Sequence, residues 1–146
     1  MLEPVSRVPA DGVAQTLGGA PLRILLVDDS DDDALLVRRM LCKALPQGLE
    51  LQHAASAERA LVLLAARSFD LLILDVRLPL ADGLEYLRHL SGTPPLANLP
   101  VLVVSADGDT LARFQPEPHR IYLAKPMRST VLFTAIKQLL KDAGPA

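Results

Sequence analysis

The chain has 146 residues, of which 50% are hydrophobic and 22% are charged, and its formal net charge is −2. This composition excludes an intrinsically disordered chain, which needs more charge and fewer apolar residues. The small negative charge argues against binding to nucleic acid, and 3% aromatic content without tryptophan argues against a base-stacking surface. A single cysteine excludes an internal disulfide.

The first 20 residues show no hydrophobic periodicity, and they contain two prolines and three glycines. We predict a flexible N-terminal tail over 1–20. The basic and apolar stretches of a signal peptide are missing, and no apolar run reaches the roughly 18 residues of a membrane span. We therefore expect a cytoplasmic protein with one folded domain over 21–143. A domain of about 120 residues leaves no room for an output domain.

Short apolar runs alternate with segments of helical periodicity along the rest of the chain. In chain order, the predicted elements are a strand over 22–27, a helix over 31–45, a strand over 49–55, a helix over 56–67, a strand over 70–74, a helix over 83–90, a strand over 100–104, a weak helix over 106–114, a strand over 119–123 and a helix over 129–141. Strict alternation favours right-handed β-α-β crossovers. The predicted fold class is α/β, a doubly wound five-stranded parallel sheet with helices on both faces.

The starts of the first two predicted helices carry capping residues. Ser30, with the aspartates at 31–33, suits the start of the first helix, and Ser56 suits the start of the second. Asp31, Asp32 and Asp33 are interpreted as solvated residues of a first helical turn. Cys42 is interpreted as a small core or boundary residue.

Polar side chains follow four of the five predicted strands. Asp28 and Asp29 follow the first strand, Asp75 the third, Ser105 the fourth and Lys125 the fifth. In doubly wound sheets this carboxyl edge is where ligands bind. Carboxylates gathered there would repel one another, and a raised pKa or a bound cation relieves the repulsion.

Hard oxygen ligands with positions left for water suit Mg²⁺, which commonly acts together with a phosphoryl group. Lys125 would add a positive charge and Ser105 a hydroxyl donor to such a site. Asp75 is the candidate nucleophile, since an aspartate can attack phosphorus and hold it as an acyl phosphate. His53, His89 and His119 lack metal-ligand spacing and are interpreted as non-ligands.

Four stretches of the sequence together resemble the receiver domain of two-component response regulators, and the resemblance extends over about residues 22–142. The stretches lie in the same order as in that family and cover 24–30, 74–83, 103–106 and 122–126. The resemblance implies a flavodoxin-like fold with strand order 2-1-3-4-5. It also implies a stand-alone receiver that assists its own phosphorylation and dephosphorylation and is not otherwise an enzyme.

The resemblance also implies roles for individual residues. Asp75 corresponds to the phosphoacceptor, charged by a histidine kinase or a histidine phosphotransfer protein. The implied ligands of Mg²⁺ (or Mn²⁺) are Asp29 directly, Asp28 through water, Asp75, and the backbone carbonyl of Arg77. Ser105 and Lys125 correspond to the residues that hold the phosphoryl group. Ser105 and Tyr122 correspond to the switch pair. No organic cofactor is implied.

The segment over 106–121 departs from the family. It is shorter than expected, and Pro116, Pro118 and Gly108 predict a short or irregular fourth helix. This region contributes to the family's signalling face, so partner binding is expected to differ, and homodimer formation stays open. Arg77 and Asp107 each follow a site residue by two positions. We predict that they pair across the mouth of the pocket and slow loss of the phosphoryl group.

Three other functions are alternatives to that of a phosphorylated receiver. A pseudo-receiver would keep the fold as a phosphorylation-independent protein-binding module, although every catalytic residue type is present. An aspartyl-phosphate hydrolase would need a second acid where Arg77 stands. Binding of FMN would need a phosphate-binding loop after the first strand, where acids stand instead. The favoured output is contact with a downstream protein, and the sequence specifies neither that protein, the kinase nor the stimulus.

Overall fold

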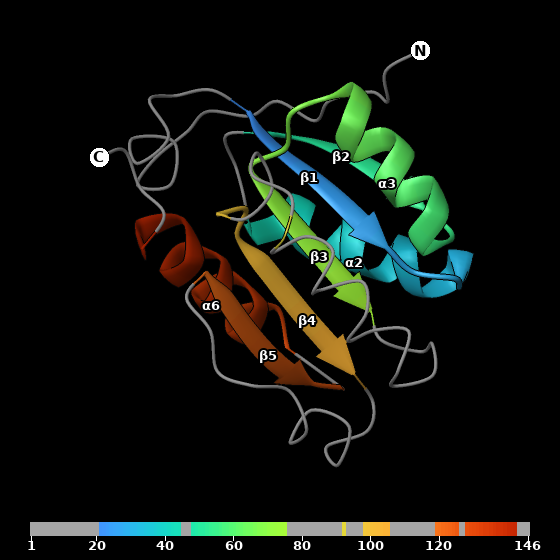
Figure 1. Ribbon diagram of the computed structural model, residues 1–146. Coiled ribbons are helices and arrows are strands. Elements are labelled where there is room, and N and C mark those ends of the chain that lie inside the picture. Colours follow the sequence, from blue (N-terminus) through green and yellow to red (C-terminus); the bar gives the residue numbers. More distant parts are fainter. Residues whose placement is uncertain are drawn as a thin grey trace.

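The structure is a computed structural model, and it describes residues 21–44, 48–75, 92, 98–105, 119–125 and 128–142. Its elements, labelled as in Figure 1, are β1 (Leu22–Val27), α2 (Asp31–Ala44), β2 (Leu49–Ala54), α3 (Ala57–Ala66), β3 (Leu71–Asp75), β4 (Val101–Ser105), β5 (Arg120–Ala124) and α6 (Ser129–Asp142). Each agrees with its predicted range to within one residue. The helices predicted over 83–90 and 106–114, and the tail over 1–20, lie outside the described residues.

The five strands form one parallel sheet in the order β2-β1-β3-β4-β5, which confirms the predicted fold class and strand order. The chain therefore reverses its direction of winding between β1 and β3, which are hydrogen-bonded neighbours. β3 and β4 are each one residue later than predicted. Asp75 is paired with Val104 and Ser105 with Ala124, so both polar residues end strands within the ladder.

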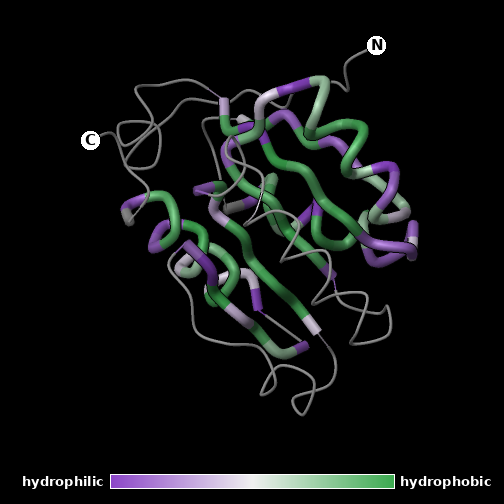
Figure 2. Tube along the Cα trace, viewed as in Figure 1, coloured by the Kyte–Doolittle hydropathy of each residue, from purple (hydrophilic) through white to green (hydrophobic). Residues whose placement is uncertain are grey.

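Helices cover both faces of the sheet (Figure 1). On one face, α2 and α6 pack against side chains that include Ile24, Ile73 and Leu102. On the other face, α3 packs against a second cluster that includes Leu25, Leu72 and Val103. Alternate residues of each central strand thus enter opposite cores, which is why these strands are continuous apolar runs. Figure 2 shows this apolar character along the central strands.

Two serines begin α2 and α3 as the sequence predicts. The Oγ atom of Ser30 accepts a hydrogen bond of 3.2 Å from the backbone N–H of Asp33. The Oγ atom of Ser56 accepts one of 3.1 Å from the backbone N–H of Arg59. Each bond satisfies a donor that the helix itself leaves without a partner.

The interpretation of Cys42 as a core or boundary residue is wrong, because this residue is exposed. The buried stripe of α2 includes Ala34, Val37 and Leu41. Leu35 and Cys42 are seven residues apart and therefore share one face, about a quarter-turn from that stripe. Leu35 is exposed as well. Apolar residues at helical spacing therefore need not be buried, because the buried face of α2 is narrower than its apolar face.

The turn before β5 has an unusual backbone. His119 has a φ of 66°, in the left-handed region that favours glycine, and its carbonyl accepts a hydrogen bond of 2.8 Å from the N–H of Val101. In the described part of the chain, no helix has the length and apolar character needed to cross a membrane.

Candidate functional site

The carboxyl edge of the sheet gathers three of the residues expected there. Asp28 follows β1, Asp75 ends β3, and Lys125 follows β5. The Nζ atom of Lys125 donates a hydrogen bond to Oδ2 of Asp75 and forms an ion pair with it. The lysine's backbone is fixed as well, since its N–H donates to the carbonyl of Ser105 over 2.8 Å. The hydrogen bonds between β4 and β5 thereby position Lys125 so that its side chain reaches the end of β3.

Asp75 is the most unusual acid of the site. It is 6% exposed, although it stands at the end of a strand. Burial raises the pKa of Asp75 from 3.8 to about 6, and the carboxylate of Asp28 adds to the rise, while Lys125 opposes it. A pKa of about 6 still leaves roughly nine-tenths of the carboxyl groups ionised at pH 7, so the nucleophilic form predominates.

Asp28 is held by contacts on both its backbone and its side chain. It is 1% exposed, and its Oδ1 atom accepts a hydrogen bond of 2.9 Å from the N–H of Ser30. Its own N–H donates to the carbonyl of Ala54 over 3.0 Å. Its carbonyl lies 2.7 Å from Nε2 of His53. The carboxylate therefore reaches the site from a loop that is fixed to both β2 and α2.

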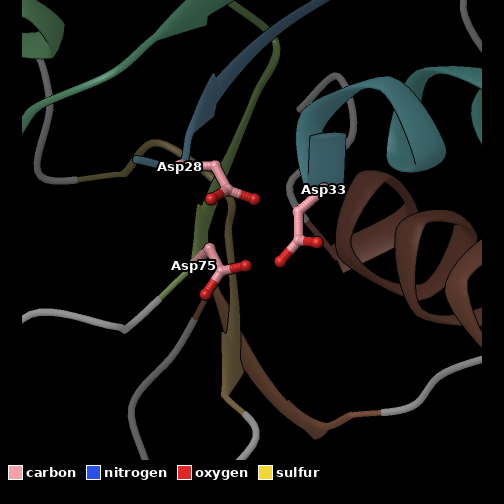
Figure 3. Close-up of side chains that lie close together, drawn as sticks. All are labelled: Asp28, Asp33 and Asp75. Atoms are coloured by element: carbon pink, nitrogen blue, oxygen red, sulfur yellow. The ribbon is translucent and has the colours of Figure 1, made fainter. Parts of the chain in front are cut away.

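Asp33 belongs to this site, although its sequence pattern did not predict it. Its Oδ2 atom lies 3.2 Å from Nζ of Lys125, and its side chain is 27% exposed. Figure 3 shows its carboxylate approaching those of Asp28 and Asp75 from the first turn of α2. The interpretation of Asp33 as a solvated residue is therefore wrong. Asp33 precedes the buried Val37 by four residues, so the two side chains share one face of the helix. This spacing is the sequence signal that could have placed Asp33 toward the sheet.

The other predicted site residues do not belong to the cluster of Asp28, Asp33 and Asp75. Asp29 is exposed and is not one of the three clustered acids. Ser105 is buried at the end of β4, and Tyr122 is partly buried against the core cluster beneath α3. Arg77 and Asp107 lie outside the described residues, so their expected pairing stays a prediction.

The clustered carboxylates fit a divalent cation. One oxygen atom from each of Asp28, Asp33 and Asp75 can be chosen so that all three lie within 4.8 Å of one another. Carboxylate oxygens are the ligands that Mg²⁺ and Mn²⁺ prefer, and a site of few protein ligands leaves positions for water and a phosphoryl oxygen. A cation here would also relieve the repulsion among the three negative charges.

The chain is similar in sequence and in fold to known proteins. The sequence model of a family described as "Response regulator receiver domain" matches residues 24–137. The chain is 36% identical over 106 residues to the gliding motility regulatory protein of Myxococcus xanthus, with 73% of this chain and 12% of that protein covered. It is 35% identical over 128 residues to the response regulator MprA of Mycolicibacterium vanbaalenii, with 86% of this chain and 53% of that protein covered.

The chain therefore spans 12% and 53% of the lengths of these two curated relatives. Among solved structures, it is similar to a sensor protein from Polaromonas sp. JS666, with a TM-score of 0.75 and 27% sequence identity. That alignment covers 86% of this chain and 100% of the other.

Proposed function

The chain belongs to the response regulator receiver domain family, and from that premise we propose that Asp75 accepts a phosphoryl group from a histidine kinase or histidine phosphotransfer protein. The observation that carries the proposal is the environment of Asp75. Its buried carboxylate ends the central strand β3, beside the ammonium group of Lys125. A carboxylate that is shielded from bulk water and faces a cation is suited to attack phosphorus.

In the proposed transfer, an ionised oxygen of Asp75 forms a bond to phosphorus. The bond between phosphorus and the donor's histidine nitrogen breaks, and the nitrogen keeps the electron pair and takes up a proton. The product is an acyl phosphate, with two negative charges where the carboxylate had one. The chain thus acts as a phosphoacceptor that assists its own reaction, and it is not an enzyme for a separate substrate.

Positive charge must stabilise the added phosphoryl oxygens. Lys125 already contacts Asp75, and the buried Ser105 ends the neighbouring strand β4. We assign both residues to hold the phosphoryl group. The proposed ligands of Mg²⁺ or Mn²⁺ are Asp28, Asp29, Asp75 and the backbone carbonyl of Arg77. The cation supplies electrostatic stabilisation of phosphoryl charge when it is bound.

The proposed output is contact with a downstream protein, because receiver domains act through their kinases and their target proteins. Ser105 and Tyr122 are the proposed switch pair, and their backbones lie on the neighbouring strands β4 and β5. Movement of the Ser105 hydroxyl toward the phosphoryl group would let the partly buried Tyr122 ring turn inward. We place this signalling in the cytoplasm.

The experiment that tests the proposal is phosphorylation of the full chain by acetyl phosphate with Mg²⁺, followed on a phosphate-affinity gel. Wild type should shift, Asp75→Asn should not, and Asp32→Asn should shift like wild type. Asp32 is a matched control because it is an exposed acid on α2. A wild-type chain that never shifts and binds no beryllofluoride would contradict the proposal. That result would favour the pseudo-receiver, a protein-binding module that acts without phosphorylation.

The proposed pair of Arg77 and Asp107 has a separate test. If the pair limits access of water to the phosphoryl group, Arg77→Ala should lose the phosphoryl group faster than wild type. The readout is the first-order rate of dephosphorylation after the donor is removed. An unchanged rate would contradict the pairing without affecting the assignment of Asp75.

A further inference from the structure

A cavity of about 210 Å³ lies between the amino ends of β1 and β2 and the loop that follows α3. Its lining includes Arg23 and Glu50, which are the second residues of these two strands and face each other across the ladder. Asp28 and Asp75 stand at the opposite ends of β1 and β3, so the cavity is separate from the site of the clustered acids. Its volume is below the roughly 300–1,000 Å³ of a pocket for a drug-sized ligand, so it suits a small metabolite.

Three polar side chains of β1 and β2 form one wall of the cavity. Leu25 of β1 and Ala54 of β2 belong to the core cluster that α3 covers. Strand residues two positions apart share a face of the sheet, so Arg23, Glu50 and Gln52 lie on the same face as this cluster. The apolar core beneath α3 therefore ends at these three residues, which line the cavity.

The charge of Arg23 is matched by a neighbouring acid of the protein. An Nη atom of Arg23 lies 3.5 Å from Oδ1 of Asp70, and the backbone N–H of Arg23 donates to Oδ2 over 2.9 Å. The N–H of Asp70 in turn donates to the carbonyl of Arg23 over 2.8 Å. These contacts tie the loop before β3 to the start of β1, and they leave the pair without net charge.

Arg67 and Glu50 bring opposite charges to the cavity that are not matched in this way. Both line it and both are partly buried. Within the part of the chain that the structure describes, neither side chain forms an ion pair, with the other or with a third residue. The backbone of Arg67 is fixed at the end of α3, where its N–H donates to the carbonyl of Leu63 over 3.0 Å. Two separated charges of opposite sign are complementary to a small molecule that carries both signs.

We propose that this cavity binds a free α-amino acid with an uncharged side chain, with the ligand's carboxylate on Arg67 and its ammonium group on Glu50. A guanidinium group matches a carboxylate through two parallel N–H donors, and a carboxylate accepts from an ammonium group. Gln52 and Ser68 add uncharged hydrogen-bonding groups to the lining, and the ring of Phe69 adds apolar surface for the ligand's side chain.

Two simpler ligands fit the same cavity less well. A phosphate ion would gain Arg67 but would face the carboxylate of Glu50, and a metal cation would gain Glu50 but would face Arg67. A side chain with its own charge would meet only the neutral pair of Arg23 and Asp70. The inference goes beyond the proposed function and does not depend on phosphorylation.

The first experiment finds the ligand. The full-length, unphosphorylated chain is screened by thermal shift against each of the common protein L-amino acids in turn, at millimolar concentration. Isothermal titration then gives the affinity of the tightest binder and of two analogues. One analogue is the carboxylic acid that lacks the ammonium group, and the other is the carboxamide that lacks the carboxylate. Each analogue should bind about tenfold more weakly or worse, because each loses one charged contact.

The second experiment assigns each charge to its residue. Arg67→Gln and Glu50→Gln should each weaken binding of the amino acid by about tenfold or more. Glu50→Gln should also lose the preference for the amino acid over the carboxylic acid, and Arg67→Gln the preference over the carboxamide. A residue that only supported the fold would not change these two preferences separately.

The matched controls are Arg59→Gln and Glu58→Gln, which remove the same charges from exposed positions on α3. Both should stay within about twofold of wild type, since exposed charges are largely screened. Circular dichroism checks the folding of each variant. Glu50→Thr and Arg67→Ala replace the glutamine variants if these do not fold.

Three results would overturn the inference. One is a wild-type chain that binds no amino acid more tightly than about 1 mM. Another is an analogue that binds as tightly as the amino acid itself. The third is equal affinity in the cavity variants and their controls, which would place binding elsewhere on the chain. No phosphodonor or divalent cation is present, so these results do not bear on the phosphorylation of Asp75.

Discussion

The side chain of His53, at the end of β2, donates a hydrogen bond through Nε2 to the backbone carbonyl of Asp28, with 2.7 Å between the two atoms. The carbonyl can only accept, so Nε2 carries the hydrogen. Nδ1 of the same ring lies 3.9 Å from Oδ1 of Asp31, at the start of α2. His53 therefore ties the loop that carries the buried Asp28 to strand β2. In the sequence, His53 is an isolated histidine that gives no sign of this role.

His53→Ala should lower the free energy of unfolding by about 1 kcal/mol, because it removes one partly buried hydrogen bond. It should also weaken Mg²⁺ binding, since the Asp28 loop loses a fixed position. Urea denaturation and calorimetric titration measure the two effects. Gln52→Ala is the control, because Gln52 is the adjacent, partly buried residue of β2 and belongs to the opposite face of the sheet. Equal Mg²⁺ affinity in the two variants would contradict this role.

The raised pKa of Asp75 predicts that stability depends on pH in the absence of divalent cations. The pKa is 3.8 unfolded and about 6 folded, so between these values the folded chain binds more protons than the unfolded chain. Stability therefore falls as the pH rises through this window, by up to about 3 kcal/mol. Asp75→Asn cannot ionise and should lack this loss.

The measurement is urea denaturation of wild type and Asp75→Asn in EDTA at a series of pH values from 4 to 8. The difference in unfolding free energy should move in favour of the variant as the pH rises, and it should level off above about pH 6. Any constant effect of losing the contact with Lys125 cancels, because only the change with pH is read. A difference that stays constant over the series would count against the raised pKa.

The sequence alone predicted the sheet and the described elements, because buried parallel strands and amphipathic helices have distinct periodicities. It also placed Asp28, Asp75 and Lys125 together at one edge of the sheet, because the carboxyl ends of parallel strands must meet there. Asp33 was missed for a physical reason. Asp31, Asp32 and Asp33 are three identical residues in a row, so the sequence does not distinguish them. Only the rotation of α2 about its axis, relative to the sheet, decides which of them faces Lys125.

The left-handed backbone of His119 predicts that glycine is more stabilising than alanine at this position. An L-residue at φ 66° is strained relative to glycine by about 1 kcal/mol or somewhat more. His119→Gly should therefore unfold at higher urea concentration than His119→Ala, since both variants lose the imidazole ring but only glycine relieves the strain. Urea midpoints of the two variants provide the measurement. Equal midpoints would show that the turn before β5 relaxes without strain.

Loss of either helix cap, of α2 or of α3, should lower stability, but only loss of the α2 cap should also weaken cation binding. Ser30→Ala and Ser56→Ala each remove a side-chain acceptor for a helix N–H, so each should lower the free energy of unfolding by about 1 kcal/mol. Of the two serines, only Ser30 accepts its hydrogen bond from the turn that carries Asp33. Ser30→Ala should therefore weaken Mg²⁺ binding as well, whereas Ser56→Ala should leave it unchanged.

Urea denaturation and titration with MgCl₂ on the same two variants measure both quantities. Ser56→Ala is a matched control, because it loses the same kind of hydrogen bond, of 3.1 Å against 3.2 Å, on a helix that covers the other face of the sheet. Equal losses of Mg²⁺ affinity would mean that general destabilisation weakens the site. A loss confined to Ser30→Ala means that the start of α2 holds Asp33 in the cation site, since the Ser30 hydroxyl accepts a hydrogen bond from the backbone N–H of Asp33.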